Sequence, residues 1–351
     1  MTKGTGCDTI QKGEKAFFSP RKRVSNSNNR PQKITGGRKK IHSNANKSHS
    51  TLRAGIEDLS SFTKVKKRAQ KLLQWDEIPA WMRDNTFITR GYRSPTGSYK
   101  ECIKSLTYLH NEFLNVWTHF IGAIVFMVLM VTTASWVSSE IHTVKWSDVI
   151  VMYIFLAGAV GCLLLSTAYH LFSCHSHEVH RFFNRCDYVG IASLITGSCV
   201  PVFFYAFYCH DYLKVLYISM IVILGVAVCY LSISPTFSLP EWRIVRAFTF
   251  VGMAASGVIP GIHSFLAFGW AHTMQSLQLG YLSKMAAFYT VAVAFYSTRV
   301  PERWFPGKFD IWLQSHTIFH CLVLAAAGYH YIGVLKAIHW AHIHAAVCPA
   351  I

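Results

Sequence analysis

Long apolar segments separated by short polar ones make up the chain from about residue 116 onward. A helix needs about 20 apolar residues to cross a hydrocarbon core roughly 30 Å thick, and seven segments reach that length. The connecting loops are short, so neighbouring helices should be antiparallel and pack into one bundle. We therefore predict an all-α membrane protein, a seven-transmembrane helix bundle. The expected helices cover residues 116–137, 149–172, 187–209, 215–234, 245–267, 279–298 and 314–336.

The segments on either side of this bundle are different in character. Residues 1–70 are rich in Ser, Asn, Lys and Gly without periodicity, which predicts a disordered basic tail. Residues 71–115 contain two tryptophans and a proline in WDEIPAWMRDN, a pattern typical of a segment lying at the membrane surface. Residues 337–351 are expected to form a short extracellular tail.

The net charge of +17 is concentrated in the N-terminal third of the chain. Residues 1–115 carry 23 Lys and Arg against 9 Asp and Glu, a net charge of +14, and the remaining residues carry only +3. Such a tail is typical of a solvated arm near an anionic leaflet, so no nucleic-acid partner is expected. A cytosolic adaptor that contacts this tail is compatible with the sequence. The ten cysteines include no CxxC pair, which argues against a zinc ribbon or a disulfide framework.

The orientation follows from the basic residues near the helix ends, because these are retained in the cytosol. With the N-terminus cytosolic, the opposite loops contain only Lys145 and Lys214. The N-terminus is therefore expected inside and the C-terminus outside, in the plasma membrane or an endomembrane. The loops on the cytosolic side would contain Arg181, Arg185, Arg243, Arg246, Arg299, Arg303 and Lys308.

Four ionisable residues fall at one depth near the cytosolic ends of the expected helices. His170 lies in the last turns of the second helix, Asp187 opens the third, and His316 and His320 lie in the first turns of the seventh. Ionisable side chains inside a membrane are costly and usually face the protein interior. All four are therefore expected to share one leaflet and one site.

Spacing adds a second constraint on this group. His316 and His320 are four residues apart, so they lie on one face of a helix and can bind one ion together. With His170 they offer three neutral nitrogens and leave a fourth position for water, as in catalytic zinc sites. Ser166 is one turn before His170, and Asp187 could hold the water or orient a ligand. Zinc lowers the pKa of such a water to about 7.

Other interpretations of the histidines compete with a metal site. A pair at this spacing, taken alone, is more often an interfacial or packing pair. The loop with His175, His177 and His180 resembles a metal site but also a wet interfacial loop. His119 and His263 are expected to be satisfied by neighbouring helices. The same metal-or-solvent alternative applies to the tail residues His339, His342 and His344.

Several segments resemble the progestin and adipoQ receptor family, and within it the adiponectin receptor-like, haemolysin III-related members. They are SLTYLHNEFLNVWTHFIG, STAYHLFSCHS, the DYxGIA motif from Asp187, and VPERWFPGKFDIWLQSHTIFH. The resemblance runs from about Trp75 to about Gly333. It implies seven helices, a cytosolic N-terminus and a Zn²⁺ ion near the cytosolic side.

The resemblance also implies roles for individual residues. The family's zinc ligands fall on His170, His316 and His320, its aspartate beside the zinc-bound water on Asp187, and its helix-2 serine on Ser166. Two departures touch no ligand: Leu114 stands where a glycine is usual, and Thr317 where a glutamine is usual.

Three functions remain open at this point. An extracellular protein or lipid ligand could shift the helix bundle of a receptor linked to lipid and energy metabolism. A ceramidase-type hydrolase could cleave a membrane lipid amide such as ceramide, with Asp187 and Ser166 as the catalytic residues. The zinc could also be a structural clip in a protein of zinc or sterol homeostasis. An oligomer is compatible with each.

Overall fold

The computed structural model describes residues 71–344, so the expectations for residues 1–70 and 345–351 lie outside the described part of the chain. A small layer precedes the bundle. Strands β1 (Leu73–Gln74) and β2 (Arg90–Tyr92) pair antiparallel, with Leu73 opposite Tyr92. The 3₁₀ turn η1 (Ala80–Met82) lies between them, and helix α2 (Tyr99–Lys104) and the turn η2 (Ser105–Thr107) follow.

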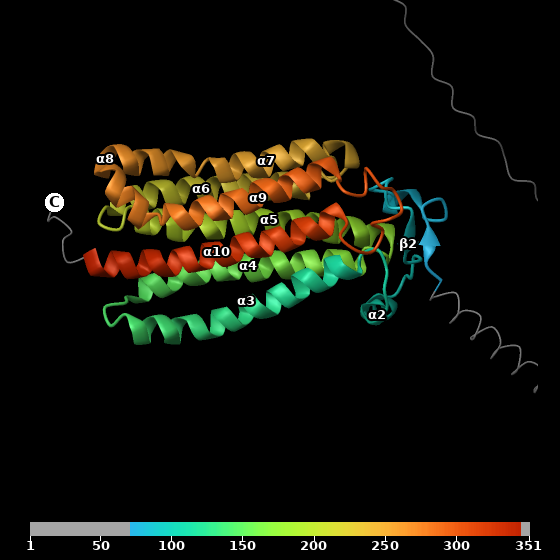
Figure 1. The fold of residues 1–351 in the computed structure, drawn as a ribbon, viewed down its shortest axis with the longest axis horizontal. Helices are drawn as coiled ribbons and strands as arrows, with labels where there is room; N and C mark the ends of the chain where they lie inside the picture. The colour runs from blue at the N-terminus through green and yellow to red at the C-terminus, as the bar shows by residue number, and fades with distance from the viewer. Residues whose placement is uncertain (1–70, 345–351) are drawn as a thin grey trace, which may run out of the picture. The chain divides into compact units, whose positions relative to one another are not determined.

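Long helices form the rest of the described chain and run nearly parallel to one axis (Figure 1). The short turn η3 (Pro240–Trp242) leads into the fifth of them. They are α3 (Phe113–Glu140), α4 (Trp146–Phe172), α5 (His177–Ala206), α6 (Asp211–Ile233), α7 (Arg243–Ala255), α8 (Val258–Ser276), α9 (Leu279–Thr298) and α10 (Ser315–His344).

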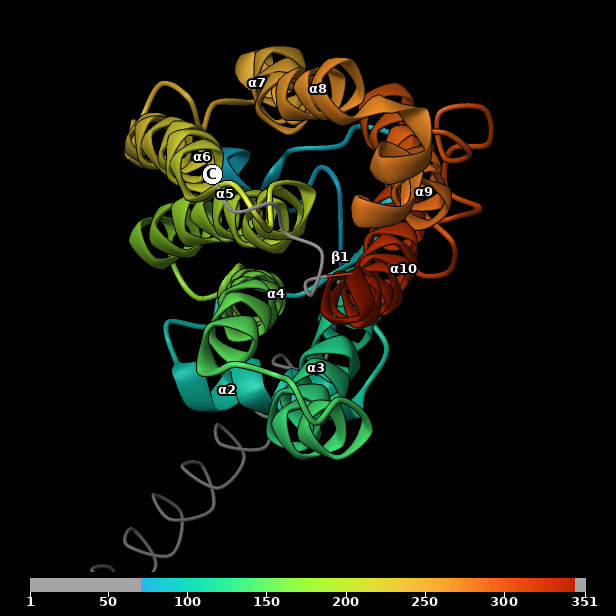
Figure 2. The same ribbon diagram turned by 90° about the vertical axis from the view of Figure 1, so that its left-hand side faces the viewer.

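Viewed end-on, these helices follow one another around a closed ring (Figure 2). Helix α3 packs against α4 on one side and α10 on the other, so the first and last helices of the bundle are neighbours. This closure matters for function, because it brings residues from the start, middle and end of the chain to one place. The outer faces are apolar and exposed, as at Val131, Ile223 and Leu266. Such faces suit contact with lipid.

By length and composition, six helical segments of the described chain can cross a membrane: α3, α4, α5, α6, Pro240–Ser276 and most of α10. The protein is therefore an integral multi-pass membrane protein. Helix α9 has the bounds expected for the sixth span, residues 279–298, but it is not among the six. It contains Lys284 and several hydroxyl side chains, which lower its apolar character.

Three of the expected helices differ from the observed ones by more than a few residues. Helix α5 begins at His177, ten residues before Asp187, because the Ser176 side chain caps it by accepting from the Val179 N–H. The helix expected over 245–267 is two helices, and Pro260 lies in the first turn of α8, where its missing N–H costs nothing. Helix α10 continues past the expected end at residue 336 to His344, and Ala341 in this added part is buried against the core.

Helices α4 and α5 approach unusually closely. A Cβ on Gly158 would lie 2.8 Å from the Ser193 carbonyl oxygen, and one on Gly197 would lie 2.9 Å from that of Ile154. Small residues at such contacts let two backbones meet without lipid between them. The contact fixes α5, which contains Asp187, against α4, which contains His170.

Candidate metal centre

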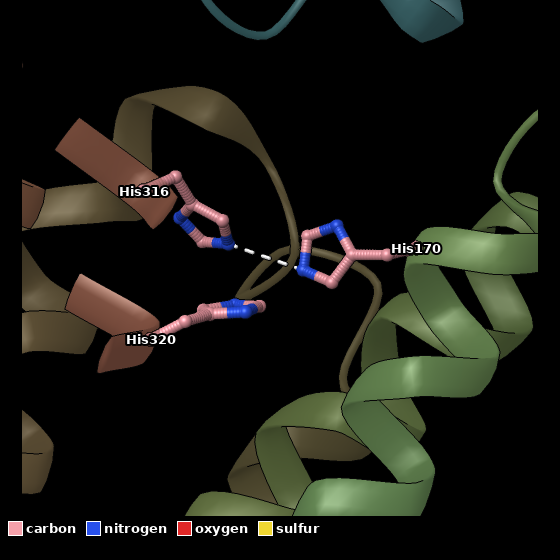
Figure 3. A group of neighbouring side chains, drawn as sticks. All are labelled: His170, His316 and His320. Atoms are coloured by element: carbon pink, nitrogen blue, oxygen red, sulfur yellow. Dashed lines mark hydrogen bonds between the residues drawn. The ribbon is translucent and has the colours of Figure 1, made fainter. Parts of the chain in front are cut away.

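Three imidazoles meet at the end of the bundle that lies next to the β1–β2 layer. His170 is in the last turn of α4, and His316 and His320 are in the first two turns of α10. Figure 3 shows the three rings facing one another across the gap between these helices. One nitrogen from each ring lies within 4.8 Å of the other two. His170 and His320 are almost fully buried. The structure therefore brings together the three predicted ligands.

The tautomer of His170 follows from its neighbour Glu112, the residue before α3. The Glu112 Oε2 atom lies 2.7 Å from Nδ1 of His170. Burial opposes ionisation of Glu112, but the His170 ring and a hydrogen bond from Asn115 outweigh it and lower the pKa of this carboxyl. A carboxylate only accepts, so Nδ1 of His170 carries a proton. In the neutral ring, Nε2 then presents a lone pair to the centre.

The tautomer of His320 is decided in the same way. Its Nδ1 lies 3.1 Å from the Asn115 carbonyl oxygen, which can only accept, and 3.2 Å from Oγ1 of Thr118. The Asn115 side chain extends the network: Nδ2 donates to Glu112 at 2.8 Å, and Oδ1 accepts from Thr317 at 2.7 Å. One turn of α3 thus orients a ring on α4 and a ring on α10.

These contacts leave ring nitrogens directed at each other. The Nε2 atoms of His170 and His316 are 3.1 Å apart. Two lone pairs at that distance repel unless a proton or a cation lies between them. Tetrahedral zinc with Zn–N bonds of about 2.0–2.1 Å places two ligand nitrogens roughly 3.3 Å apart. The separation of the His170 and His316 nitrogens therefore fits a zinc ion, and the three histidines are the residues that would hold it.

The two predicted catalytic residues also lie at this cluster. Asp187 and Ser166 are both buried, and the Asp187 carboxyl is close enough to His170 and Ser166 to interact with both. Asp187 lies in the third turn of α5 and does not open the helix, because α5 starts earlier than expected. Next to a metal held by these histidines, the carboxylate would be placed to accept a proton from water.

A buried arginine fixes the end of α4 next to His170. The Arg93 guanidinium donates to the carbonyl oxygens of His170 at 2.6 Å and Leu171 at 2.8 Å. These carbonyls belong to the last turn of α4, where backbone donors run out, and a cation at a helix C-terminus is also favoured by the helix dipole. Arg93 therefore links the surface layer to the turn that carries a candidate ligand.

The other histidines of the sequence do not converge on a second site within residues 71–344. The ring of His177 stacks on Trp81, and Nδ1 of His180 lies 3.1 Å from the Ser173 carbonyl oxygen. His263 is satisfied as expected, with Nδ1 2.6 Å from the Tyr217 hydroxyl.

His119 differs from the expectation. Its ring stacks on His320 with centroids 3.6 Å apart, and neither of its nitrogens has a hydrogen-bond partner. The His119 ring thus packs flat against the ring of the candidate ligand His320. The stacking follows from its place one turn beyond Asn115 on the face of α3 that meets α10.

Sequence reasoning missed three residues that orient the candidate ligands. They are Glu112, just before α3, and Asn115 and Thr118 in the first turns of α3. The available signal was a carboxylate and an amide three residues apart at the start of an apolar helix. That pattern also fits an ordinary helix N-terminus, so it becomes informative only when α3 is known to lie beside α4 and α10.

Removing the Glu112 charge should weaken metal binding without removing a ligand. We expect Glu112→Gln to lower zinc affinity about 10–100-fold, since partners that orient ligating histidines typically contribute that much. Competition with a fluorescent zinc chelator measures this effect. Glu101→Gln, in the partly exposed pair with Lys104, is the matched control and should change nothing. Equal affinity in Glu112→Gln and wild type would mean that Glu112 does not orient His170.

Fold and site together define a class: a polytopic helical membrane protein with a buried histidine cluster at one end of its helix bundle. Comparison with known proteins agrees with this class. The family model described as Haemolysin-III related matches residues 107–331, and the chain belongs to this family.

Relatives in fly and worm carry receptor names. The chain is 45% identical over 271 residues to an adiponectin receptor protein of Drosophila melanogaster, covering 77% of this chain and 60% of that one. It is 41% identical to progestin and adipoQ receptor-like protein 1 of Caenorhabditis elegans, covering 79% and 63%. A heptahelical transmembrane protein of Oryza sativa subsp. japonica is 36% identical, with 77% and 85% covered. The chain thus spans about three-fifths of the length of the fly and worm relatives.

Proposed function

We propose that this chain is a zinc-dependent hydrolase of membrane lipid amides, such as ceramide, on an adiponectin receptor-like seven-helix scaffold. The observation that carries the proposal is the buried Asp187 carboxyl, which interacts with His170, one of the three converging imidazoles. A purely structural zinc site would normally complete its tetrahedron with a fourth protein ligand. Here the three histidines would leave a fourth position for water, next to a buried acid.

Each residue of the site has its own role in the proposed hydrolysis. Bound zinc would supply a Lewis acid and a more acidic water. Asp187 accepts the proton that water loses as it attacks the amide carbonyl, and it returns a proton to the leaving amine. The Ser166 hydroxyl orients that carboxyl. Burial of the cluster excludes bulk water, which strengthens these interactions.

A cavity in the bundle supports a lipid substrate. It has a volume of about 740 Å³ and is lined largely by apolar side chains of α5, α8 and α9, with His330 of α10 at its wall. His330 is ten residues beyond His320, which is about 15 Å along a helix. An acyl chain in this cavity can belong to the same lipid whose polar amide lies at the histidine cluster. Exposed lining residues such as Ile262 and Trp270 give lateral access from the bilayer.

The proposed orientation places the histidine cluster in the cytosolic leaflet. All of the basic loop residues predicted to be cytosolic lie at the end of the bundle that carries the β1–β2 layer. At the other end, Cys209 between α5 and α6 is disulfide-bonded, as suits an oxidising compartment. With α9 counted as a span, seven helices put the N-terminus in the cytosol and the C-terminus outside.

The test is release of fatty acid from a short-chain ceramide by purified protein in lipid nanodiscs, followed by mass spectrometry. We expect Asp187→Asn to keep its zinc and lose about 10²–10⁴-fold in turnover, the usual contribution of a general acid–base group. Asp211→Asn, whose side chain is 93% exposed at the opposite end, is the control and should keep full turnover. A zinc-loaded wild type that releases no fatty acid would show the centre to be structural.

Receptor activity is the second candidate, and the names of the fly and worm relatives favour it. An extracellular ligand would then shift the bundle between two packings, with the cytosolic layer as the output. Ligand-dependent signalling in cells that express Asp187→Asn separates the two functions. Signalling that survives loss of turnover would mean that hydrolysis is not the signal.

A further inference from the structure

Two cysteines meet outside the candidate metal centre, where the surface layer touches the end of α4. Cys102 is in α2, and Cys174 follows α4 by two residues. Their Sγ atoms are 3.6 Å apart, and the two residues are 0% and 1% exposed. A disulfide needs an S–S distance of about 2.05 Å, so a movement of roughly 1.5 Å would join them. Among the free cysteines of residues 71–344, no other pair makes such a contact.

The backbone already holds these two segments together. The Thr96 N–H donates to the Cys174 carbonyl at 3.0 Å, and the Gly97 N–H donates to the His175 carbonyl at 2.9 Å. The Thr96 hydroxyl lies 3.3 Å from Sγ of Cys102. The two thiols therefore stay close without a covalent bond, which is the arrangement that makes disulfide closure easy.

The surroundings divide the pair into a nucleophile and a proton donor. A hydrogen bond from the Cys174 thiol, with help from Thr96 and the Arg93 guanidinium, overcomes burial and lowers the pKa of Cys102 to about 6. The same hydrogen bond and burial raise the pKa of Cys174. Cys102 is then the sulfur that ionises first and becomes the reactive thiolate, while Cys174 remains a thiol.

We propose that Cys102 and Cys174 are an oxidisable dithiol that closes to an intramolecular disulfide on reaction with hydrogen peroxide. The Cys102 sulfur attacks one peroxide oxygen, the O–O bond breaks, and a sulfenic acid and hydroxide form. The Cys174 sulfur then attacks the sulfenic sulfur, the S–O bond breaks, and its proton and the departing hydroxide leave as water. Overall, two thiols lose two electrons and two protons, and one peroxide becomes two waters.

Only a small oxidant can readily reach the buried thiols of Cys102 and Cys174. Helix α2 has only six residues, and its Tyr99 and Ile103 are about half exposed, at 48% and 52%. Short surface elements open locally far more often than the core of a fold. Such openings admit a molecule the size of water, whereas a bulky disulfide reagent would need α2 to leave its place.

Closure would covalently fasten α2 to the segment four residues after His170. The proposal goes beyond the proposed hydrolase and does not depend on zinc or on turnover. It concerns a thiol pair that a cell keeps reduced on the cytosolic side and that oxidant stress can close.

The experiment uses the full-length protein in nanodiscs. The protein is treated with hydrogen peroxide, free thiols are blocked with N-ethylmaleimide, and non-reducing digests are analysed by mass spectrometry. We expect a linked peptide pair containing Cys102 and Cys174, lighter by two hydrogen atoms than the reduced peptides and lost on treatment with dithiothreitol. Oxidation should also raise the thermal unfolding temperature of the wild type.

Variants separate a specific disulfide from general oxidation. Cys102→Ser and Cys174→Ser should each abolish the link and the thermal shift, while Cys162→Ser, also buried but without a cysteine contact, should keep both. The wild-type digest alone already decides the matter if the serine variants fail to fold. Sulfinic acid on Cys102 without a linked pair, or full alkylation of both thiols after peroxide, would overturn the proposal.

Discussion

Replacing His316 and His320 with alanine is expected to abolish zinc binding. Purified wild type should contain about one zinc per chain, as a site with three protein ligands holds one ion. The double variant retains only His170, and a single imidazole cannot hold zinc against competing water. We expect its zinc content to fall at least tenfold, because two of three ligand bonds are lost. Elemental analysis of detergent-purified protein measures the ratio directly.

The matched control is His177→Ala, which removes an exposed histidine from the same end of the bundle. Its zinc content should equal that of the wild type. Size-exclusion profiles of all three proteins show whether they remain folded. Wild type that is well folded and free of zinc, including after incubation with excess metal, would contradict the prediction. The three histidines would then share a proton between Nε2 atoms and serve packing only.

Loss of the Glu302 carboxylate is expected to destabilise the fold by about 3 kcal/mol, the value for leaving buried donors unpaired after removal of a charged acceptor. Glu302 is fully buried ahead of α10. Its carboxylate accepts from the Ser315 N–H at 2.8 Å, from the Ser315 hydroxyl, and from the Asn85 side chain at 3.1 Å. Ser315 is the first residue of α10 and precedes the candidate ligand His316.

The measurement is the free energy of unfolding in detergent for Glu302→Ala beside Glu241→Ala, which removes an exposed carboxylate. The control should stay within about 0.5 kcal/mol of the wild type, as surface substitutions usually do. Zinc affinity provides a second readout, since a frayed start of α10 would displace His316. A Glu302→Ala protein as stable as the wild type would mean that water replaces the carboxylate.

The helices were largely predictable because lipid forces apolar runs to be long. The expected run 279–298 coincides with α9, and the expected run 149–172 differs from α4 only at its start. Two of the errors fall where a helix leaves the apolar region. Six of the first ten residues of α5 are polar or charged, and the last eight of α10 include three histidines. Hydropathy does not detect such turns, although backbone hydrogen bonding continues through them.

The sequence alone determines three features of this protein. They are the length of the apolar runs, the spacing of His316 and His320, and the equal depth of His170 and Asp187. Period and hydropathy depend only on the order of residues, so they determine a helical membrane protein with three candidate ligands. Which rings meet, and what orients them, depends on how helices pack. Only the tertiary structure places Glu112 on His170 and Asn115 on His320, because α3 closes the ring between α4 and α10. The packing of α2 against the end of α4 brings Cys102 to Cys174, a contact between residues 72 positions apart that no local pattern encodes.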